Sequence, residues 1–354
     1  MSEGNSKPRR GALANPANRF LALQRSHDAD FADIDPAEEP LPVTRFLPDA
    51  SQSVLSRNDS PDVGFAWSVN PYRGCEHGCA YCYARPTHEY LGYGAGIDFE
   101  SRILVKHDAP VLLRDALSKP SWTPEAIALS GVTDCYQPVE RRLGLTRRCL
   151  AVLAEFRNPT VIVTKNALVA RDIDLLSELA RHRAVAVFVS LTTLDPGLRS
   201  VLEPRASPPA ARLEAIRRLA DAGVPVGILM APIIPAINDH EIPRVVEAAV
   251  RAGAAYASYT LLRLPLSVRS VFLEWLRRHF PDREAKVLGQ LREFRDGGLN
   301  AAGFGDRMRG TGPAADRLAT LFAVAKRRHG IGTAFPELSA AAFRRVEPGQ
   351  PELF

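Results

Sequence analysis

The sequence Gly74-Cys75-Glu76-His77-Gly78-Cys79-Ala80-Tyr81-Cys82 brings three of the five cysteines in the chain into one short stretch. Thiolate sulfur is a soft ligand that selects iron–sulfur clusters or zinc over hard cations, so this C-x3-C-x2-C triad predicts one metal centre held by Cys75, Cys79 and Cys82. Iron–sulfur cubanes normally take four cysteines. A local set of three leaves one iron without a protein ligand, and that iron is where chemistry could take place.

A structural zinc site is the alternative, with His77 or His88 completing a Cys3His ligand set. Zinc ligands usually come as C-x2-4-C pairs with the second pair well downstream, so the spacing favours a cluster. A disulfide framework is not expected, because five cysteines in 354 residues are sparse and odd in number.

The composition is that of an ordinary globular protein, with 46% hydrophobic and 24% charged residues. No apolar run approaches the roughly 20 residues that span a bilayer, so we expect a cytoplasmic protein without a membrane partner. The net charge is +5, and residues 263–354 hold 16 Lys and Arg against 10 Asp and Glu. This balance suits a nucleic acid partner, although a solvated arginine-rich surface would explain it equally well.

Apolar, β-prone runs alternate along the chain with amphipathic helical segments. Such an alternation predicts a parallel sheet covered on both faces. Six right-handed βα units favour an α/β fold of the partial (βα)6 TIM-like barrel type, with its active site at the C-terminal ends of the strands. An open doubly wound sheet predicts the same alternation and remains the alternative. We expect the strands at about 66–70, 126–130, 160–164, 185–191, 224–230 and 256–262.

The barrel pattern covers residues 61–280 and is flanked on both sides. Residues 1–60 are rich in Pro, Asp, Ser and Arg, which predicts a largely extended or disordered N-terminal extension. Residues 281–354 predict a helical, basic C-terminal region, with helices near 284–296 and 313–328 around an arginine-rich loop at 304–310. We also expect a helix over 79–91, directly after the cysteines.

Polar residues follow several of the predicted strands. Asp134 comes after the second strand, Lys165 follows the third, and Ser190 ends the fourth. A lysine directly after a buried strand would point its ammonium group into the open end of a barrel, where a carboxylate could neutralise it. A surface lysine at the start of a loop is equally consistent with the pattern.

The cysteine triad, with Tyr81 before its last member, resembles the signature of radical S-adenosylmethionine (SAM) enzymes. That resemblance implies a partial (βα)6 barrel whose three cysteines hold a [4Fe–4S] cluster, with SAM bound to the fourth iron. It implies that one electron cleaves SAM and that the resulting 5′-deoxyadenosyl radical takes a hydrogen atom from the substrate. A reductase or flavodoxin-type protein would supply the electron.

Shorter stretches are similar to spore photoproduct lyase and its relatives described as DNA-repair photolyases. These stretches are Thr164-Lys165, Ser190, Glu203-Pro204 and residues 212–215, and residues 68–79 resemble a bacterial branch of the same group. The resemblance implies that Lys165 and Ser190 contact SAM, that Asp134 and Arg212 do so too, and that Tyr81 meets the adenine.

A lyase- or transferase-type reaction on a nucleic acid or nucleotide would follow from this resemblance. A peptide or small metabolite is an alternative substrate, and a non-catalytic, zinc-stabilised nucleic-acid-binding protein is an alternative function. If the loop carrying Arg307 and Arg309 faces the open end of the barrel, a phosphate-bearing substrate is favoured over a metabolite.

One position departs from the family pattern. Photoproduct lyases place a hydrogen-donating cysteine just after the second strand, where this chain has Gly131. Cys135 lies four residues on and is the candidate catalytic residue if the loop folds back. Cys149 falls on the apolar stripe of a helix, where a packed structural cysteine is expected.

Overall fold

A seven-stranded sheet organises the computed structural model, which describes residues 10–21, 42–332 and 335–346. Six of its strands are parallel and each pairs with the next one along the chain, while β2 (Leu55–Arg57) joins the far edge antiparallel to β3. The edge strands β10 and β2 do not pair with each other in the described ranges, so the barrel is open and the predicted partial (βα)6 fold is confirmed. The six parallel strands are β3 (Trp67–Val69), β6 (Ile127–Leu129), β7 (Thr160–Thr164), β8 (Val185–Ser190), β9 (Val226–Ile233) and β10 (Tyr256–Leu261).

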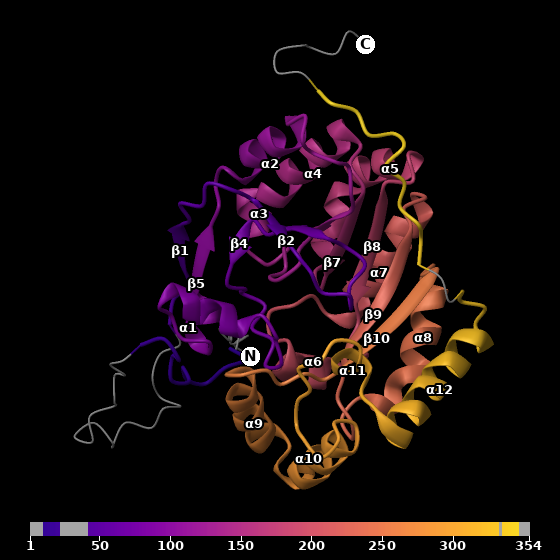
Figure 1. The fold of residues 1–354 in the computed structure, drawn as a ribbon. Coiled ribbons are helices and arrows are strands. Elements are labelled where there is room, and N and C mark those ends of the chain that lie inside the picture. The colour runs from indigo at the N-terminus through magenta and orange to yellow at the C-terminus, as the bar shows by residue number, and fades with distance from the viewer. Residues whose placement is uncertain (1–9, 22–41, 333–334, 347–354) are drawn as a thin grey trace, which may run out of the picture.

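Alternate residues of these strands point outward into one large apolar core beneath the helices, as Val187 and Val189 of β8 and Ile228 and Met230 of β9 do. The β-branched residues of β7, Thr-Val-Ile-Val-Thr, suit such a half-buried pleated surface. Figure 1 shows the helices lining the outer side of the sheet. The covering helices are α4 (Leu145–Phe156), α5 (Ile173–Arg181), α7 (Pro209–Asp221), α8 (Ile242–Arg251) and α12 (Gly312–Arg328).

Helix α7 illustrates how the sequence sets these bounds. Pro209 occupies its first turn, where a missing N–H costs nothing. Gly223 follows its end with a φ of 74°, a left-handed conformation that glycine adopts without strain.

The N-terminal extension is more structured than a disordered segment in its described part. Strand β1 (Arg45–Pro48) pairs with β5 (Arg102–Val105), which also pairs with β4 (Tyr72–Arg73) in a second sheet of three strands. The rest of the predicted extension, 1–9 and 22–41, lies outside the described residues.

The helix predicted over 79–91 is corrected by the structure. The segment instead makes tight turns that end in a 3-10 helix, η2 (Arg85–Leu91), which has Pro86 in its first turn. Turns of this type bond residues three apart, as in the hydrogen bonds from Cys82 N to Cys79 O and from Arg85 N to Cys82 O. The remaining short helices are α1 (Ile97–Ser101), α2 (Ala109–Ser118), α3 (Glu140–Leu143), α6 (Pro196–Leu202), η3 (Ala167–Asp172), η4 (Asp239–Glu241) and η5 (Pro281–Arg283).

Helix α9 (Val268–His279) follows β10, and the C-terminal region then contains α10 (Glu284–Glu293) and the single turn α11 (Asp306–Arg309), which precede α12. The chain then leaves α12 and runs past α5, in yellow in Figure 1. Its backbone bonds to residues that precede strands, from Ser339 N to Arg183 O and from Arg344 N to Phe156 O. This segment therefore lies at the N-terminal ends of β7 and β8, opposite the end of the barrel where the strands finish.

We call that opposite end, where the C-termini of the six parallel strands lie, the mouth.

No helix among the described residues is both long and apolar enough to cross a membrane.

Candidate functional site

The cysteine loop, residues 74–82, leaves β4 and folds at the mouth. Gly74 and Gly78 have φ angles of 82° and 66°, and a Cβ on Gly74 would lie 3.0 Å from the carbonyl oxygens of Arg102 and Phe99. Both positions therefore need glycine. The loop backbone is anchored where Cys75 N donates to Phe99 O at 2.9 Å and Ala80 N donates to Leu202 O at 3.1 Å.

The three thiols of this loop are free and largely shielded from solvent. Cys75 and Cys79 are each 6% exposed, and Cys82 is half-buried. Burial, and then charges that include the neighbouring thiolates, raise the pKa of Cys75, and burial raises the pKa of Cys79 to about 12. Thiols in such surroundings need a cation to become thiolates. Three soft donors in one short loop match the ligand type of an iron–sulfur cluster.

Neither histidine named for the zinc alternative joins the cysteines. The Nδ1 atom of His77 lies 3.3 Å from Asp134 Oδ2, and its Nε2 atom lies 3.4 Å from the amide of Asn166. His88 places Nε2 2.9 Å from the carbonyl oxygen of Arg102, which it must reach as a donor. Within the described ranges no group of three or more His, Cys, Asp or Glu side chains, the three cysteines included, is placed to hold a metal ion. The cysteines therefore match a cluster by ligand type and spacing.

A buried ion pair supports the loop from behind. Arg85 is fully buried, donates through Nη2 to Glu100 Oε1 at 2.5 Å, and also donates to Cys79 O at 2.8 Å. The carboxylate of Glu100 in turn accepts from the backbone N–H groups of Gly11 and Ala12. A Cβ on Gly11 would fall 1.6 Å from Gly78 O, so the N-terminal segment lies directly against the cysteine loop.

Asp134 lies between the cysteine loop and the end of β7. Its carboxylate faces His77 and accepts from Lys165 N at 2.7 Å and from the Thr164 hydroxyl at 2.8 Å. Although burial opposes it, these contacts, led by His77, lower the pKa of Asp134 to about 2. Asp134 thus fixes the position from which the Lys165 side chain leaves β7.

The structure brings two other predicted residues, Tyr81 and Arg212, into contact with Glu203. This carboxylate accepts from the Tyr81 hydroxyl and pairs with Arg212, and it accepts from the Thr192 hydroxyl at 2.7 Å. Against the effect of burial, Arg212 and then Lys165 lower the pKa of Glu203 to about 2. Arg212 is 1% exposed and also donates to Ser190 O at 2.8 Å.

Lys165 is the half-buried member of this group. Its Nζ atom lies 5.7 Å from the centre of the Tyr81 ring, within the range of a cation–π contact. Burial disfavours its charge, but Cys79, Glu203 and Asp134 together raise the pKa of Lys165. An ammonium group is therefore held beside the cysteine loop.

The sequence places Glu203 in a stretch that is similar to the photoproduct lyase group but does not predict it as a site residue. The Glu203-Pro204 pair is the feature of the sequence that could have identified it. Its partners Thr192 and Arg212 lie in separate stretches of sequence, so their convergence could not be seen before folding.

Cys135 does not reach the mouth. Its side chain is fully buried in the apolar core, with Sγ 3.8 Å from Leu129 O, and burial raises its pKa well above the usual value. Cys149 lies in the same core, as expected for its helix stripe. Gly131 is at the mouth, where its carbonyl oxygen accepts from the Tyr83 hydroxyl at 3.0 Å.

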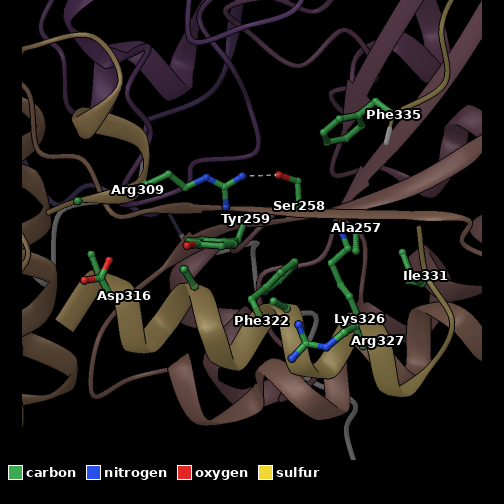
Figure 2. A pocket seen from close by; sticks show the side chains of 14 residues that line it. Ala257, Ser258, Tyr259, Arg309, Asp316, Phe322, Lys326, Arg327, Ile331 and Phe335 are labelled. Carbon is green, nitrogen blue, oxygen red and sulfur yellow. Dashed lines mark hydrogen bonds between the residues drawn. The ribbon is translucent and has the colours of Figure 1, made fainter. Parts of the chain in front are cut away.

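The arginine-rich loop borders the barrel beside β10, but its own guanidinium groups are occupied. Arg307 pairs with Asp62 and lies 4.5 Å from the centre of the Phe304 ring. Figure 2 shows Arg309 crossing the edge strand to donate to the Ser258 hydroxyl at 2.9 Å, above the ring of Tyr259. Arg309, Ser258 and Tyr259 line part of a pocket of about 460 Å³ between β10 and α12.

A family model described as the radical SAM superfamily matches residues 69–249, which includes the cysteine loop and most of the barrel. A protein of Mycobacterium tuberculosis is 38% identical over 220 residues, which are 62% of this chain and 65% of that protein. A Methanocaldococcus jannaschii protein is 30% identical over 184 residues, 52% of this chain and 66% of that one. The match therefore spans about two thirds of the length of each relative.

Among solved structures, a mutant of spore photoproduct lyase with bound AdoMet and dinucleoside spore photoproduct is similar in fold. Its TM-score is 0.58 at 16% sequence identity, and the match covers 83% of this chain and 82% of that one. Another mutant of that lyase gives a TM-score of 0.57 at 17% identity over 80% of this chain and 79% of the other. Family match and fold agree, and this chain belongs to the radical SAM superfamily.

Proposed function

We propose that this protein is a radical SAM enzyme that holds a [4Fe–4S] cluster on Cys75, Cys79 and Cys82 and acts on a nucleic acid or nucleotide. The observation that carries the proposal is the cysteine loop itself, three free thiols on one anchored loop at the open end of a barrel in a radical SAM chain. When bound, the cluster supplies the electron that cleaves SAM reductively, and a reductase or flavodoxin-type protein would deliver it.

Lys165 and Ser190 are the proposed contacts of SAM. The ammonium group of Lys165 is held beside Cys79 and makes no ion pair with a carboxylate among the described residues, which leaves it available to the carboxylate of SAM. Ser190 ends β8 at the mouth. Asp134, Tyr81 and Arg212 complete the proposed cofactor site by holding these two residues in place, since Asp134 binds the Lys165 backbone and Arg212 binds that of Ser190.

The substrate class is supported by the fold neighbours and by charge. Spore photoproduct lyase binds a dinucleoside photoproduct in its solved complexes. The present chain carries a net charge of +5, and the arginine-rich loop, residues 304–310, borders the barrel beside β10. Gly131 stands where the lyase resemblance requires a hydrogen-donating cysteine, and Cys135 is packed in the core, so reversal of a thymine dimer is not part of the proposal.

The test is anaerobic reconstitution with iron and sulfide, followed by incubation with SAM, a reductant and candidate substrates. We expect a brown protein that contains iron and sulfide, with 5′-deoxyadenosine formation stimulated by a nucleic acid or nucleotide fraction. Stimulation by a peptide or small-metabolite fraction alone would replace the substrate class while keeping the chemistry. A colourless protein that takes up only zinc would refute the enzyme and leave the zinc-stabilised binding protein.

A further inference from the structure

Arg263 is a cation at the mouth whose pairing is incomplete. It comes two residues after the end of β10, the last strand of the barrel, and is half-buried. Its Nε atom is buried without a hydrogen-bond partner, and its Nη1 atom faces only the thioether sulfur of Met308 at 3.8 Å. A thioether is a weak acceptor, so this guanidinium lacks an oxygen partner among the described residues.

The neighbouring arginines, in contrast, each have at least one oxygen partner. Arg307 is neutralised by Asp62, Arg309 donates to Ser258, and Arg295 donates to the carbonyl oxygens of Leu262 and Asp306. Burial, and then the guanidinium of Arg307, lower the pKa of Arg263. Since Asp62 compensates only one of the two groups, this side of the mouth keeps an excess positive charge.

Tyr83 connects Arg263 to the cysteine loop. It directly follows Cys82, and its ring centre lies 6.0 Å from the Arg263 guanidinium carbon. The Tyr83 hydroxyl is fixed on Gly131 O, while the residue as a whole is 52% exposed. A planar group could therefore lie against this ring while an anionic group attached to it met Arg263.

Resting on the proposed function, we infer that Arg263 binds a phosphate group of the substrate, and that the substrate is therefore a nucleotide or a strand containing one. Guanidinium donors in a planar fork match phosphate oxygens, and a half-buried cation without an oxygen partner gains the most from such a ligand. Lys165, beside the ring of Tyr81, is left for the carboxylate of SAM. The arginine-rich loop acts indirectly, because Met308 and the Asp62–Arg307 pair shape the position of Arg263.

Binding to the reconstituted, SAM-loaded protein tests this inference without requiring turnover. The probes are the dinucleoside monophosphates TpT and UpU, each compared with its uncharged methylphosphonate analogue. We expect the wild type to prefer a charged probe, and Arg263→Gln to weaken that probe about tenfold or more, the loss of one charge-assisted hydrogen bond. The salt dependence, that is the slope of log affinity against log salt, should be weaker for Arg263→Gln than for the wild type, and the affinity of Arg263→Lys should lie between the two.

Arg292→Gln removes the same charge from an exposed position on α10 and should leave both affinity and salt slope unchanged. Equal affinity of the wild type for charged and uncharged probes, or unaltered binding by Arg263→Gln, would overturn the inference. So would an equal loss of SAM affinity in Arg263→Gln, since that would assign the group to the cofactor. Failure to form 5′-deoxyadenosine would count against the proposed function, whereas the binding result stands separately.

Discussion

The two sides of the barrel mouth handle charge in opposite ways. Around β7 and β8 the buried carboxylates of Asp134 and Glu203 each contact a cation or several hydrogen-bond donors. Arg212 donates hydrogen bonds to Glu203 and to backbone carbonyl oxygens. Beside β10 and α11, Arg263 faces a thioether and an aromatic ring. Paired buried charges stabilise and position a site, whereas a half-buried charge without a partner costs free energy until a ligand arrives. The first side therefore holds its buried charges in fixed contacts, whereas the second leaves one guanidinium without an oxygen partner among the described residues.

The largest expected effect is on the paired side. Glu203→Gln leaves Arg212 buried without its counter-charge, because both side chains are almost fully inaccessible. We expect the free energy of unfolding in urea to fall by about 3–5 kcal/mol. Glu214→Gln, on the exposed face of α7, is the matched control and should unfold like the wild type. A loss for Glu203→Gln no larger than that of the control would show that the pair is not a structural element.

His88, which is buried behind the cysteine loop, differs from the paired charges because burial keeps it neutral. Burial, opposed by the carbonyl of Arg102, lowers the pKa of His88 to about 4 from an ordinary value near 6.5. The unfolded chain then binds the proton more readily, so the stability from this residue is present above about pH 6.5 and is lost as the pH falls toward about 4. The full loss is roughly 3 kcal/mol.

Urea unfolding of the wild type between pH 7.5 and pH 4.5 measures this loss, and His88→Asn should remove that part of the pH dependence. An NMR titration of His88 gives the same answer without a variant. A His88 pKa near 6.5 would contradict the assignment.

Asp134→Asn should have a smaller effect, because the amide keeps one oxygen for Lys165 N but loses the charge facing His77. We expect a loss of about 2 kcal/mol in unfolding free energy. In the reconstituted enzyme the affinity for SAM should also fall, since Asp134 fixes the position of the Lys165 backbone. Full SAM affinity in a destabilised variant would separate Asp134 from the cofactor site.

The smallest effect on stability should be that of Arg263. Arg263→Leu removes a charge that has no oxygen partner, so the unfolding free energy should stay the same or rise by up to about 1 kcal/mol. Thermal and urea unfolding measure it. A clear loss of stability would mean that Arg263 is already paired and would remove the contrast between the two sides.

Much of this fold could be predicted from sequence, because the six strands and most covering helices show their periodicity directly. The runs at Thr160–Thr164 and Val185–Ser190, and the helix ended by Gly223, fall where the pattern predicts them. Strands β1 and β5 were missed because they are short and pair across more than fifty residues. The helix predicted after Cys79 is wrong because carbonyl oxygens of the loop accept hydrogen bonds from side chains instead of from a helical backbone, as Cys79 O does from Arg85.

The candidate site was less accessible to sequence reasoning. Cysteine spacing identified the loop, and strand ends located Asp134, Lys165 and Ser190. The role of Glu203 as the centre of a buried network depends on Tyr81, Thr192 and Arg212 meeting in space. Arg263 belongs to no sequence motif. The structure is needed to show that the arginines around it have oxygen partners, whereas Arg263 has none among the described residues.

The most direct test of the central claim is 5′-deoxyadenosine formation by anaerobically reconstituted, chemically reduced protein supplied with SAM. The wild type should form it, Cys75→Ala, Cys79→Ala and Cys82→Ala should each abolish it, and Cys149→Ala, in the apolar core, should retain it. Equal activity in all of these variants, or equal loss in all four, would contradict the assignment of the cysteine loop as the cluster site.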